Sequence, residues 1–539
     1  MILRCLLLLV IFILLVNDSI KLRTKEICLK EKMYSYLCYF MIVFVTFYMM
    51  GVLGSGYHFV DDHEFVRYNK SLVSNGLIHT LCSAVKNDML IRFRFTYIII
   101  RVFESYLFPN YMVLHILQTF LVVQSLYLSY VLARKCGSSR WLSVVFSLVI
   151  YIGPQAEVWW RLGPQENWGV LFFMMTLLSI IRYMNTKRSG DFFLAVVFVF
   201  FLGGIKESFL VLLPALPLFM LWYSMRTDGG NITWIPVKKL VLEYKYFIGW
   251  IGVVFCLDIS FILCVVGTNK IGYAGIDSQF DLSNYISNVL SICTETLRDY
   301  VIITLCLFAV IMIPLVCVAI KQKRYNILIY WTLEALIFLF IFATQLVLHA
   351  KSGIFLRYYI PTTLGFGLLW IIFLSNEVCH NKKIYHIYSL LIIIAMSKII
   401  LSSDVWEKGI FYANDGKNSE AVMKEIASYA ECEPSVVSAM VGELDFSLSV
   451  YLQEVYNIET VYNAYCTGID NGRASDAYIL SDNEKKSIEF TEADIIATYE
   501  GNDEWQNLLD TLCVNMDEYI RKDFGRYYLF VRKNLADWD

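Results

Sequence analysis

Charged side chains are scarce in this sequence. Asp, Glu, Lys and Arg make up 17% of its 539 residues, whereas about 25% is usual for a soluble globular domain. Apolar residues reach 58%, against roughly 45–50% in such domains, and the mean hydropathy is +0.55. This shortage of charge excludes a chain that folds in water along its whole length.

Motifs of several common functional classes are absent as well. The 14 cysteines form no Cys-x-x-Cys pair and no Cys and His cluster at metal-ligand spacing, so the usual zinc sites are excluded. The glycine-rich dinucleotide fingerprint and the P-loop do not occur. No exposed basic stripe is interleaved with aromatic residues. We therefore expect no nucleic-acid partner and no nucleotide-sugar donor.

Long apolar blocks are what the sequence has instead, each near the roughly 20 residues that a helix needs to cross a bilayer. They predict eleven spans, near residues 34–54, 110–133, 141–158, 167–184, 191–205, 208–224, 246–267, 299–320, 326–348, 359–376 and 385–401. The apolar start, residues 1–16, is left open as a short extra span or an over-long beginning.

The basic residues predict the orientation of these spans, because Lys and Arg collect in cytoplasmic loops. The flank before the first span, within residues 1–33, is basic, and every second loop after it is basic too. Those loops carry Arg134, Lys135, Arg140, Arg182, Lys187, Arg188, Arg226, Lys238, Lys239, Lys321, Lys323, Arg324, Lys382 and Lys383. The large loop 55–109 and everything after the eleventh span then lie outside.

The C-terminal part differs in composition from the rest. Residues 402–539 hold 27 acidic and 11 basic side chains, leaving 34 basic and 21 acidic in residues 1–401. Strand-like runs at 436–441, 477–480, 495–499 and 527–531, with helical stretches at 420–429 and 505–519, predict a soluble α/β domain. We expect an all-α polytopic membrane domain, residues 34–401, followed by this extracytoplasmic domain, which is interpreted as a structural lid.

Polar clusters occupy the predicted outer face. They are Asp61-Asp62-His63-Glu64, Arg161 to Glu166, Lys206-Glu207 and Arg357-Tyr358-Tyr359-Ile360-Pro361. Ionisable residues at the mouths of apolar helices are costly unless they pair or serve a site. An acid that removes a proton from a hydroxyl, with cations that neutralise a departing phosphate, suits sugar transfer from a lipid-linked phosphate. A base opposite the leaving group implies inversion.

The segment from Gly56 to Phe65 resembles the first outer loop of the GT-C superfamily of membrane glycosyltransferases, which carries an acidic pair. The nearest likeness is to protein O-mannosyltransferase and aminoarabinose-transferase relatives. Arg92-Phe93-Arg94-Phe95, Lys206-Glu207 and the Arg357 to Pro361 segment are similar to further motifs of these enzymes, among them bacterial members. The resemblance covers residues 34 to about 401 and favours a bacterial plasma membrane, although the endoplasmic reticulum would present the same topology.

The resemblance implies roles for the clusters. Asp61 is then the base, Asp62 stands where relatives have Glu, and Glu64 supports Asp61 or binds a metal. The cations assigned to the donor phosphate are Arg357, Lys206 and Arg94, and the residues assigned to substrate are Arg161, Glu166, Glu207 and Tyr358. The enzyme would move a hexosyl or pentosyl group from a polyprenyl-phosphate sugar to a glycan, lipid or protein hydroxyl. No cofactor is certain, and a divalent metal stays open.

Simpler interpretations remain beside these roles. The acidic cluster would also serve as a solvated helix cap, and Arg357 as an interfacial anchor. Lys206 and Glu207 would neutralise each other as an ion pair, and Gly163-Pro164 would form a plain turn. The alternative functions are a transporter or flippase of lipid-linked oligosaccharide and an outer-face polysaccharide polymerase.

Overall fold

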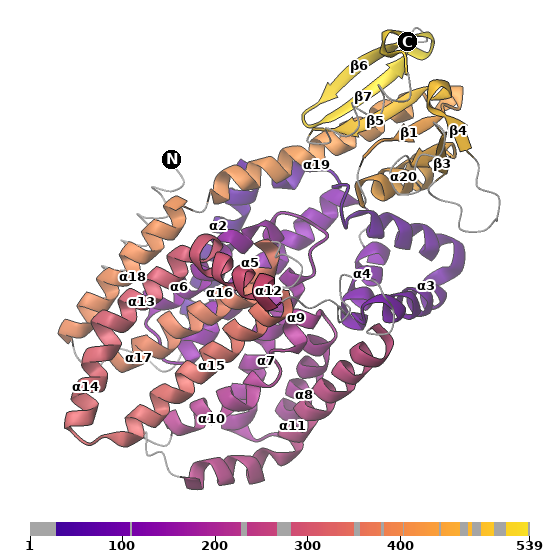
Figure 1. The fold of residues 1–539 in the computed structure, drawn as a ribbon. Coiled ribbons are helices and arrows are strands. Elements are labelled where there is room, and N and C mark those ends of the chain that lie inside the picture. The colour runs from indigo at the N-terminus through magenta and orange to yellow at the C-terminus, as the bar shows by residue number, and fades with distance from the viewer. Residues whose placement is uncertain are drawn as a thin grey trace.

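The computed structural model describes residues 29–107, 110–227, 234–266, 282–349, 356–378, 382–402, 404–440, 443–463, 473–476, 487–500 and 514–536. A large body of helices is followed by a small sheet (Figure 1). The body contains α2 (Leu29–Met50), η1 (Val52–Gly54), α3 (His63–Ile91), α4 (Phe95–Leu107), α5 (Tyr111–Lys135), α6 (Arg140–Tyr151), η2 (Pro154–Trp159), α7 (Glu166–Thr186), α8 (Ser189–Gly203), α9 (Glu207–Leu210), α10 (Ala215–Thr227), α11 (Trp234–Phe261), η3 (Ile262–Val266), α12 (Leu282–Ser291), η4 (Ile292–Thr296), α13 (Arg298–Leu307), η5 (Phe308–Met312), α14 (Ile313–Lys321), α15 (Tyr325–His349), η6 (Leu356–Tyr359), α16 (Ile360–Gly367), η7 (Leu368–Phe373), α17 (Leu374–Val378) and α18 (Lys382–Ser402).

The chain is a multi-pass membrane protein. Nine helical segments within the described residues are long and apolar enough to cross a bilayer: Lys30–Met50, Tyr111–Lys135, Glu166–Thr186, Glu207–Met225, Val237–Cys264, Arg298–Lys321, Tyr325–Leu346, Leu356–Phe373 and one that begins at Lys383. The expected apolar start, residues 1–16, lies outside the described part of the chain.

The prediction of eleven full spans is therefore corrected. The expected spans 141–158 and 191–205 form the short helices Arg140–Tyr151 and Ser189–Gly203. At 1.5 Å per residue, helices of 12 and 15 residues reach only about 18 and 22 Å, less than the roughly 30 Å of a hydrocarbon core. The first of them stops early because Gly153 and Pro154 turn the chain into η2.

The first of the predicted cytoplasmic loops contacts the start of α2. Glu31, at the start of α2, accepts hydrogen bonds from Arg134 at 2.9 Å and Arg140 at 2.8 Å. The far end of α2 leads through η1 into the loop that carries the acidic cluster. The structure thus separates these basic side chains from the acidic cluster by the length of α2.

The predicted large loop is mostly helical. Helix α3 is kinked at Gly76, and α4 packs back on it through Tyr97, Ile98 and Val102. These helices lie beside the spans and beneath the sheet (Figure 1).

The C-terminal part is joined to the body by a long helix. Helix α19 (Val405–Ser428) follows α18 and runs across the top of the body to the sheet (Figure 1). The elements that follow are η8 (Ala430–Cys432), β1 (Val436–Ser438), α20 (Glu443–Tyr456), β2 (Val461–Asn463), β3 (Arg473–Asp476), β4 (Ser487–Glu489), η9 (Phe490–Glu492), β5 (Ile495–Tyr499), η10 (Met516–Glu518), β6 (Tyr519–Phe524), β7 (Tyr527–Arg532) and α22 (Lys533–Ala536).

These strands form one mixed sheet in the order β4-β3-β2-β1-β5-β7-β6. Strand β1 pairs in parallel with β2 and β5, while β7 is antiparallel to both β5 and β6. The predicted strands at 495–499 and 527–531 are confirmed, and the one at 436–441 is shorter than expected. The predicted strand 477–480 and most of the predicted helix 505–519 lie outside the described residues, and Tyr519 begins β6 instead.

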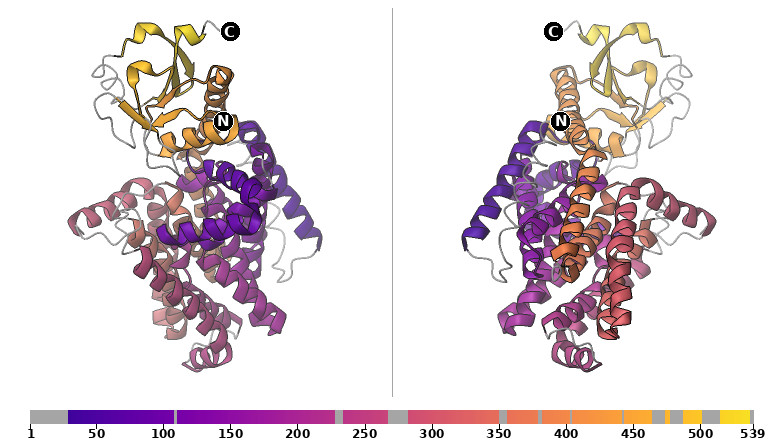
Figure 2. Two further views of the ribbon diagram at one scale, coloured as in Figure 1. Left: turned by 90° about the vertical axis from the view of Figure 1, so that its right-hand side faces the viewer. Right: turned by 90° about the vertical axis from the view of Figure 1, so that its left-hand side faces the viewer.

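The sheet and α20 stand above one end of the helical body in both side views (Figure 2). Helix α19 approaches the body closely where it carries glycine. A Cβ atom on Gly416 would lie 2.1 Å from the Ser55 hydroxyl, a separation that real atoms do not reach. The predicted domain boundary after residue 401 falls at the end of α18, and that boundary stays a prediction.

Candidate functional site

Three of the predicted polar clusters meet at one point of the structure. The Arg357 Nη1 atom lies 2.7 Å from the Asp61 carboxylate, across 296 positions of the chain. Arg161 Nη2 lies 3.8 Å from the same oxygen. The Asp61 side chain keeps 25% of its surface exposed, and the two arginines keep 17% and 12%. An acid thus faces two cations at a partly open position.

The loop geometry presents Asp61 outward. Its backbone φ is 69°, in the left-handed region that few residues other than glycine adopt. Gly163 packs directly beneath, since a Cβ atom there would lie 2.2 Å from the Asp61 Cβ. Burial alone would raise the pKa of Asp61, but the charges of Arg357 and Arg161 outweigh burial and hold that pKa well below its usual range. Asp61 is therefore a carboxylate at neutral pH.

Asp62 points the other way and is fully buried. Its Oδ2 atom accepts the His58 backbone N–H and faces the His58 Nδ1 atom, both at 3.0 Å. Burial alone would raise the pKa of Asp62, but the hydrogen bonds and charge of His58, together with the charge of Arg161, outweigh burial and lower that pKa. Although Asp62 precedes α3, its side chain makes no capping bond. The structure therefore separates the neighbouring acids: Asp61 faces the cations and Asp62 faces the interior.

Glu64 lies in the first turn of α3 and is held by residues that the sequence did not single out. Tyr97 donates a hydrogen bond to Glu64 Oε2 at 2.9 Å, and Arg101 Nε lies 3.8 Å from that oxygen. Arg101 is 1% exposed and also donates to the Gly163 carbonyl at 2.7 Å. The sequence did contain a signal for Arg101, since it lies in the otherwise apolar run of α4 and a buried guanidinium needs polar partners.

Lys206 pairs with Glu166, not with its neighbour Glu207. The two atoms Lys206 Nζ and Glu166 Oε1 are 2.5 Å apart, and both side chains are buried. Burial lowers the pKa of Lys206 to about 8, although Glu166 opposes that change. The Lys206 ammonium also lies 4.0 Å from the centre of the Tyr358 ring, next to Arg357. This second ion pair therefore adjoins the Asp61–Arg357 pair.

Two further predicted residues are engaged elsewhere. Arg94 binds Asp88 through Nε and Nη2 at 3.0 and 2.8 Å and closes the turn between α3 and α4. Among the contacts of the described residues, none joins Arg94 to the Asp61–Arg357 pair. Glu207 lies 3.9 Å from Arg92 Nε. The structure thus gathers Asp61, Arg161 and Arg357 but leaves Arg94 at a separate pair.

Glu157 and Tyr412, neither singled out from the sequence, anchor the segment that carries Arg357. Glu157 Oε1 accepts the Arg357 backbone N–H at 3.1 Å, and Glu157 Oε2 accepts the Tyr412 hydroxyl at 2.5 Å. The Arg161 guanidinium lies 5.6 Å from the centre of the Tyr412 ring. Helix α19 of the C-terminal part is therefore part of the wall of this site.

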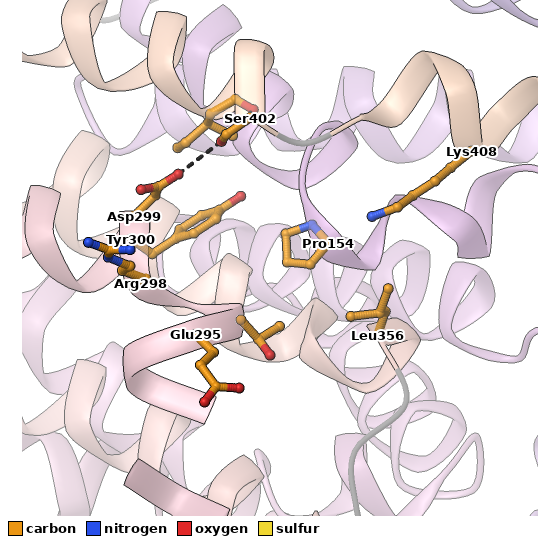
Figure 3. Close-up of a pocket in the computed structure, with 10 residues that line it drawn as sticks. Pro154, Glu295, Arg298, Asp299, Tyr300, Leu356, Ser402 and Lys408 are labelled. Atoms are coloured by element: carbon orange, nitrogen blue, oxygen red, sulfur yellow. Dashed lines mark hydrogen bonds between the residues drawn. The ribbon is translucent and has the colours of Figure 1, made fainter. Parts of the chain in front are cut away.

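A cavity of about 480 Å³ is bordered by η2 and η6. Its lining consists of Pro154, Glu295, Thr296, Arg298, Asp299, Tyr300, Leu356, Ile399, Ser402 and Lys408 (Figure 3). Leu356 directly precedes Arg357, and Lys408 extends from α19 toward Pro154 (Figure 3). Asp299 accepts a hydrogen bond from Ser402 at 2.9 Å. The cavity offers charged and hydroxyl groups beside Arg357.

Glu64 was also predicted as a possible ligand of a divalent metal. Within the described part of the chain, no three or more His, Cys, Asp or Glu side chains are grouped to hold a metal ion. The suggestion that Glu64 binds a divalent metal thus gains no support, and it stays a prediction.

Comparison with protein-family models finds no match, and comparison with curated proteins finds no significant match.

Proposed function

We propose that this protein is an inverting glycosyltransferase of the GT-C type, which moves a sugar from a polyprenyl-phosphate donor to a hydroxyl on the outer face of the membrane. The observation that carries the proposal is the Asp61 carboxylate between Arg357 and Arg161, at the ends of apolar helices. A carboxylate takes up a proton, and guanidinium groups bind phosphate. The reaction needs a proton acceptor and a phosphate-binding group, and here the side chains that would supply them contact one another at 2.7 and 3.8 Å.

The reaction would use these groups as follows. The acceptor hydroxyl attacks the anomeric carbon from the side opposite the phosphate and gives its proton to Asp61. A new carbon–oxygen bond forms, the bond to the phosphate oxygen breaks, and polyprenyl phosphate leaves with the bonding electrons. Arg357 and Arg161 stabilise the charge that grows on the phosphate. The anomeric configuration inverts because displacement is direct.

The Asp61–Arg357 ion pair gives this reaction an order of events. A carboxylate whose charge is neutralised by Arg357 at 2.7 Å is a weak base. A donor phosphate competes for the same guanidinium, since phosphate is a strong partner for arginine. Binding of donor would therefore release Asp61 to accept a proton, so that the base becomes effective only when the sugar to be transferred is present.

The surroundings provide room for the substrates. The adjoining cavity of about 480 Å³ is larger than one sugar unit and lies at the ends of α13 and α18, where a lipid-linked headgroup would enter from the bilayer. We place this face, with the C-terminal sheet, outside the cytoplasm because the predicted cytoplasmic loops are the basic ones. A bacterial plasma membrane is the proposed location.

The test is transfer of radiolabelled sugar by purified protein in lipid, with a panel of polyprenyl-phosphate sugars. Wild type should turn over at least one donor, and Asp61→Asn should lose about 100-fold or more in kcat with unchanged thermal unfolding. Asp517→Asn, a matched change at an exposed position of the sheet domain, should behave as wild type. Full activity in Asp61→Asn would refute the assignment of the base.

One observation favours the transporter as a second candidate. Two acidic side chains are buried within spans: Asp258 in α11, and Glu334 in α15, which accepts a hydrogen bond from Trp222 at 2.8 Å. Buried acids in membrane spans often mark ion or substrate pathways. Absence of turnover with every donor, together with donor flipping in vesicles that Asp258→Asn abolishes, would favour the transporter.

A further inference from the structure

The C-terminal part does more than cover the acidic loop. Four polar contacts join the loop to it. Two are hydrogen bonds to backbone carbonyls of the loop: Ser419 Oγ donates to Tyr57, and Tyr451 donates to His58 at 2.9 Å. The other two involve histidine rings of the loop: His63 Nδ1 lies 2.8 Å from Ser447 Oγ, and His58 Nε2 lies 2.9 Å from the Tyr412 carbonyl. Phe59 packs within the same apolar core as Tyr527, with ring centres 5.0 Å apart. The loop is thus built into the C-terminal domain.

His58 is the polar centre of this junction. Its ring is 2% exposed, and both ring nitrogens face oxygen atoms, those of Asp62 and of the Tyr412 carbonyl. A carbonyl only accepts hydrogen bonds, so His58 Nε2 carries a proton. The other ring nitrogen, Nδ1, faces the Asp62 carboxylate, so the His58 ring links the Tyr412 carbonyl of α19 to Asp62.

This pair fixes the turn that presents Asp61. Asp62 Oδ2 binds the ring and the backbone of His58, and the Asp62 N–H donates to the Val60 carbonyl at 2.9 Å. Asp61 lies between Val60 and Asp62 in the chain, and its backbone has the left-handed conformation. Such a conformation persists only where the surrounding structure enforces it. The direction of the Asp61 carboxylate therefore depends on Asp62, and that of Asp62 on His58.

We propose that the C-terminal domain takes part in catalysis by positioning the base: the Tyr412 carbonyl of α19 holds His58, His58 holds Asp62, and this chain of contacts aims Asp61 at Arg357. His58 is a positioning residue, because its two ring nitrogens are already occupied and it touches no reacting atom. The inference rests on the proposed function of Asp61. A domain that merely covers the site would need no buried imidazole at the junction.

The experiment compares His58→Ala with His79→Ala, an equal change at an exposed position of α3. In His58→Ala, kcat should fall by about 100-fold, since misplacement by about 1 Å costs that much, while the donor KM stays within about threefold of wild type. Added imidazole should restore about tenfold of the lost kcat by filling the vacated space. His79→Ala should keep both constants and show no response to imidazole.

A second variant keeps the test decisive if His58→Ala is poorly folded. Asp62→Ala and the double variant His58→Ala/Asp62→Ala should lose the same activity, since the two residues act as one unit. Hydrogen exchange at residues 56–66 should rise in His58→Ala and fall again with imidazole.

The outcomes separate the two proposals. Retained kcat in His58→Ala, or an unrescued loss that adds to that of Asp62→Ala, overturns the positioning role while the transferase stands. Lack of turnover by wild type overturns the transferase itself. In that case a rise in exchange at 56–66 in His58→Ala would show only that His58 holds the loop.

Discussion

At the scale of single residues, the two cations beside Asp61 control the pKa of that acid. Asp61 remains ionised because Arg357 and Arg161 offset the effect of its burial. The same cations are the groups that would meet a phosphate. The proposed base and the proposed phosphate site are therefore not independent, and a change at Arg357 should alter the titration of Asp61 as well as the proposed donor binding.

The first prediction concerns Arg357→Gln. Removal of the largest opposing charge leaves mainly Arg161 to offset the burial of Asp61, so the pKa of Asp61 should rise. Since activity needs the ionised form, the acid limb of the kcat/KM profile should move to higher pH by about 1–3 pH units. Kinetics over the acidic and neutral range, scaled to each variant's maximum, would measure this. Arg188→Gln, at an exposed position in a basic loop, should leave the limb in place, and an unmoved limb in Arg357→Gln would contradict the account.

At the scale of elements, helix α19 decides how closely the C-terminal domain approaches the body. Its glycines stand where side chains would collide: a Cβ atom on Gly416 would meet Ser55 Oγ at 2.1 Å, and one on Gly409 would meet Met50 Sδ at 2.4 Å. Tyr412 lies between these two positions on the same helix and reaches Glu157 and His58. Close packing of α19 is thus a condition for the site.

We accordingly expect Gly416→Ala to separate α19 from the loop. Overpacking of this kind costs about 1–3 kcal/mol, so thermal unfolding should occur at lower temperature and kcat should fall with it. Gly252→Ala is the matched control, because a Cβ atom there meets nothing within 4 Å on α11, and alanine favours a helix. Equal unfolding temperatures for both variants would show that α19 tolerates a wider spacing.

At the scale of the whole molecule, the C-terminal sheet stands above one end of the helical body (Figure 2), and the basic side chains that contact Glu31 lie at the start of α2, whose other end leads into the acidic loop. The orientation in which basic loops face the cytoplasm stays a prediction. Helices α6 and α8 are shorter than a full span. Since orientation alternates with each span, the side on which the following parts lie is the property to measure.

The prediction at this scale is the side on which the C-terminus lies. An epitope added after Asp539 should be accessible to antibody in spheroplasts that are intact, whereas one inserted between Lys187 and Arg188 should require permeabilisation. The loop epitope serves as the internal control for membrane integrity. An inaccessible C-terminal epitope in intact spheroplasts would place the site on the cytoplasmic side and reverse the proposed topology.

Much of this architecture follows from local sequence. The membrane class follows from the length and purity of the apolar blocks, because a bilayer core sets a minimum length for each span. The strands at 495–499 and 527–531 followed from short β-branched and aromatic runs. The number of full spans did not follow from the hydropathy of the sequence, because hydropathy alone does not show that a helix ends at Gly153 and Pro154.

The composition of the site was only partly predictable. By itself, the sequence determined a membrane protein with acidic and basic clusters at the mouths of its helices. The tertiary structure alone decided that Asp61 rather than Asp62 faces Arg357, that Lys206 pairs with Glu166, and that His58 joins the loop to α19. These contacts join residues 40 to 354 positions apart, and such pairings are set by the packing of whole elements, which no local pattern of residues encodes.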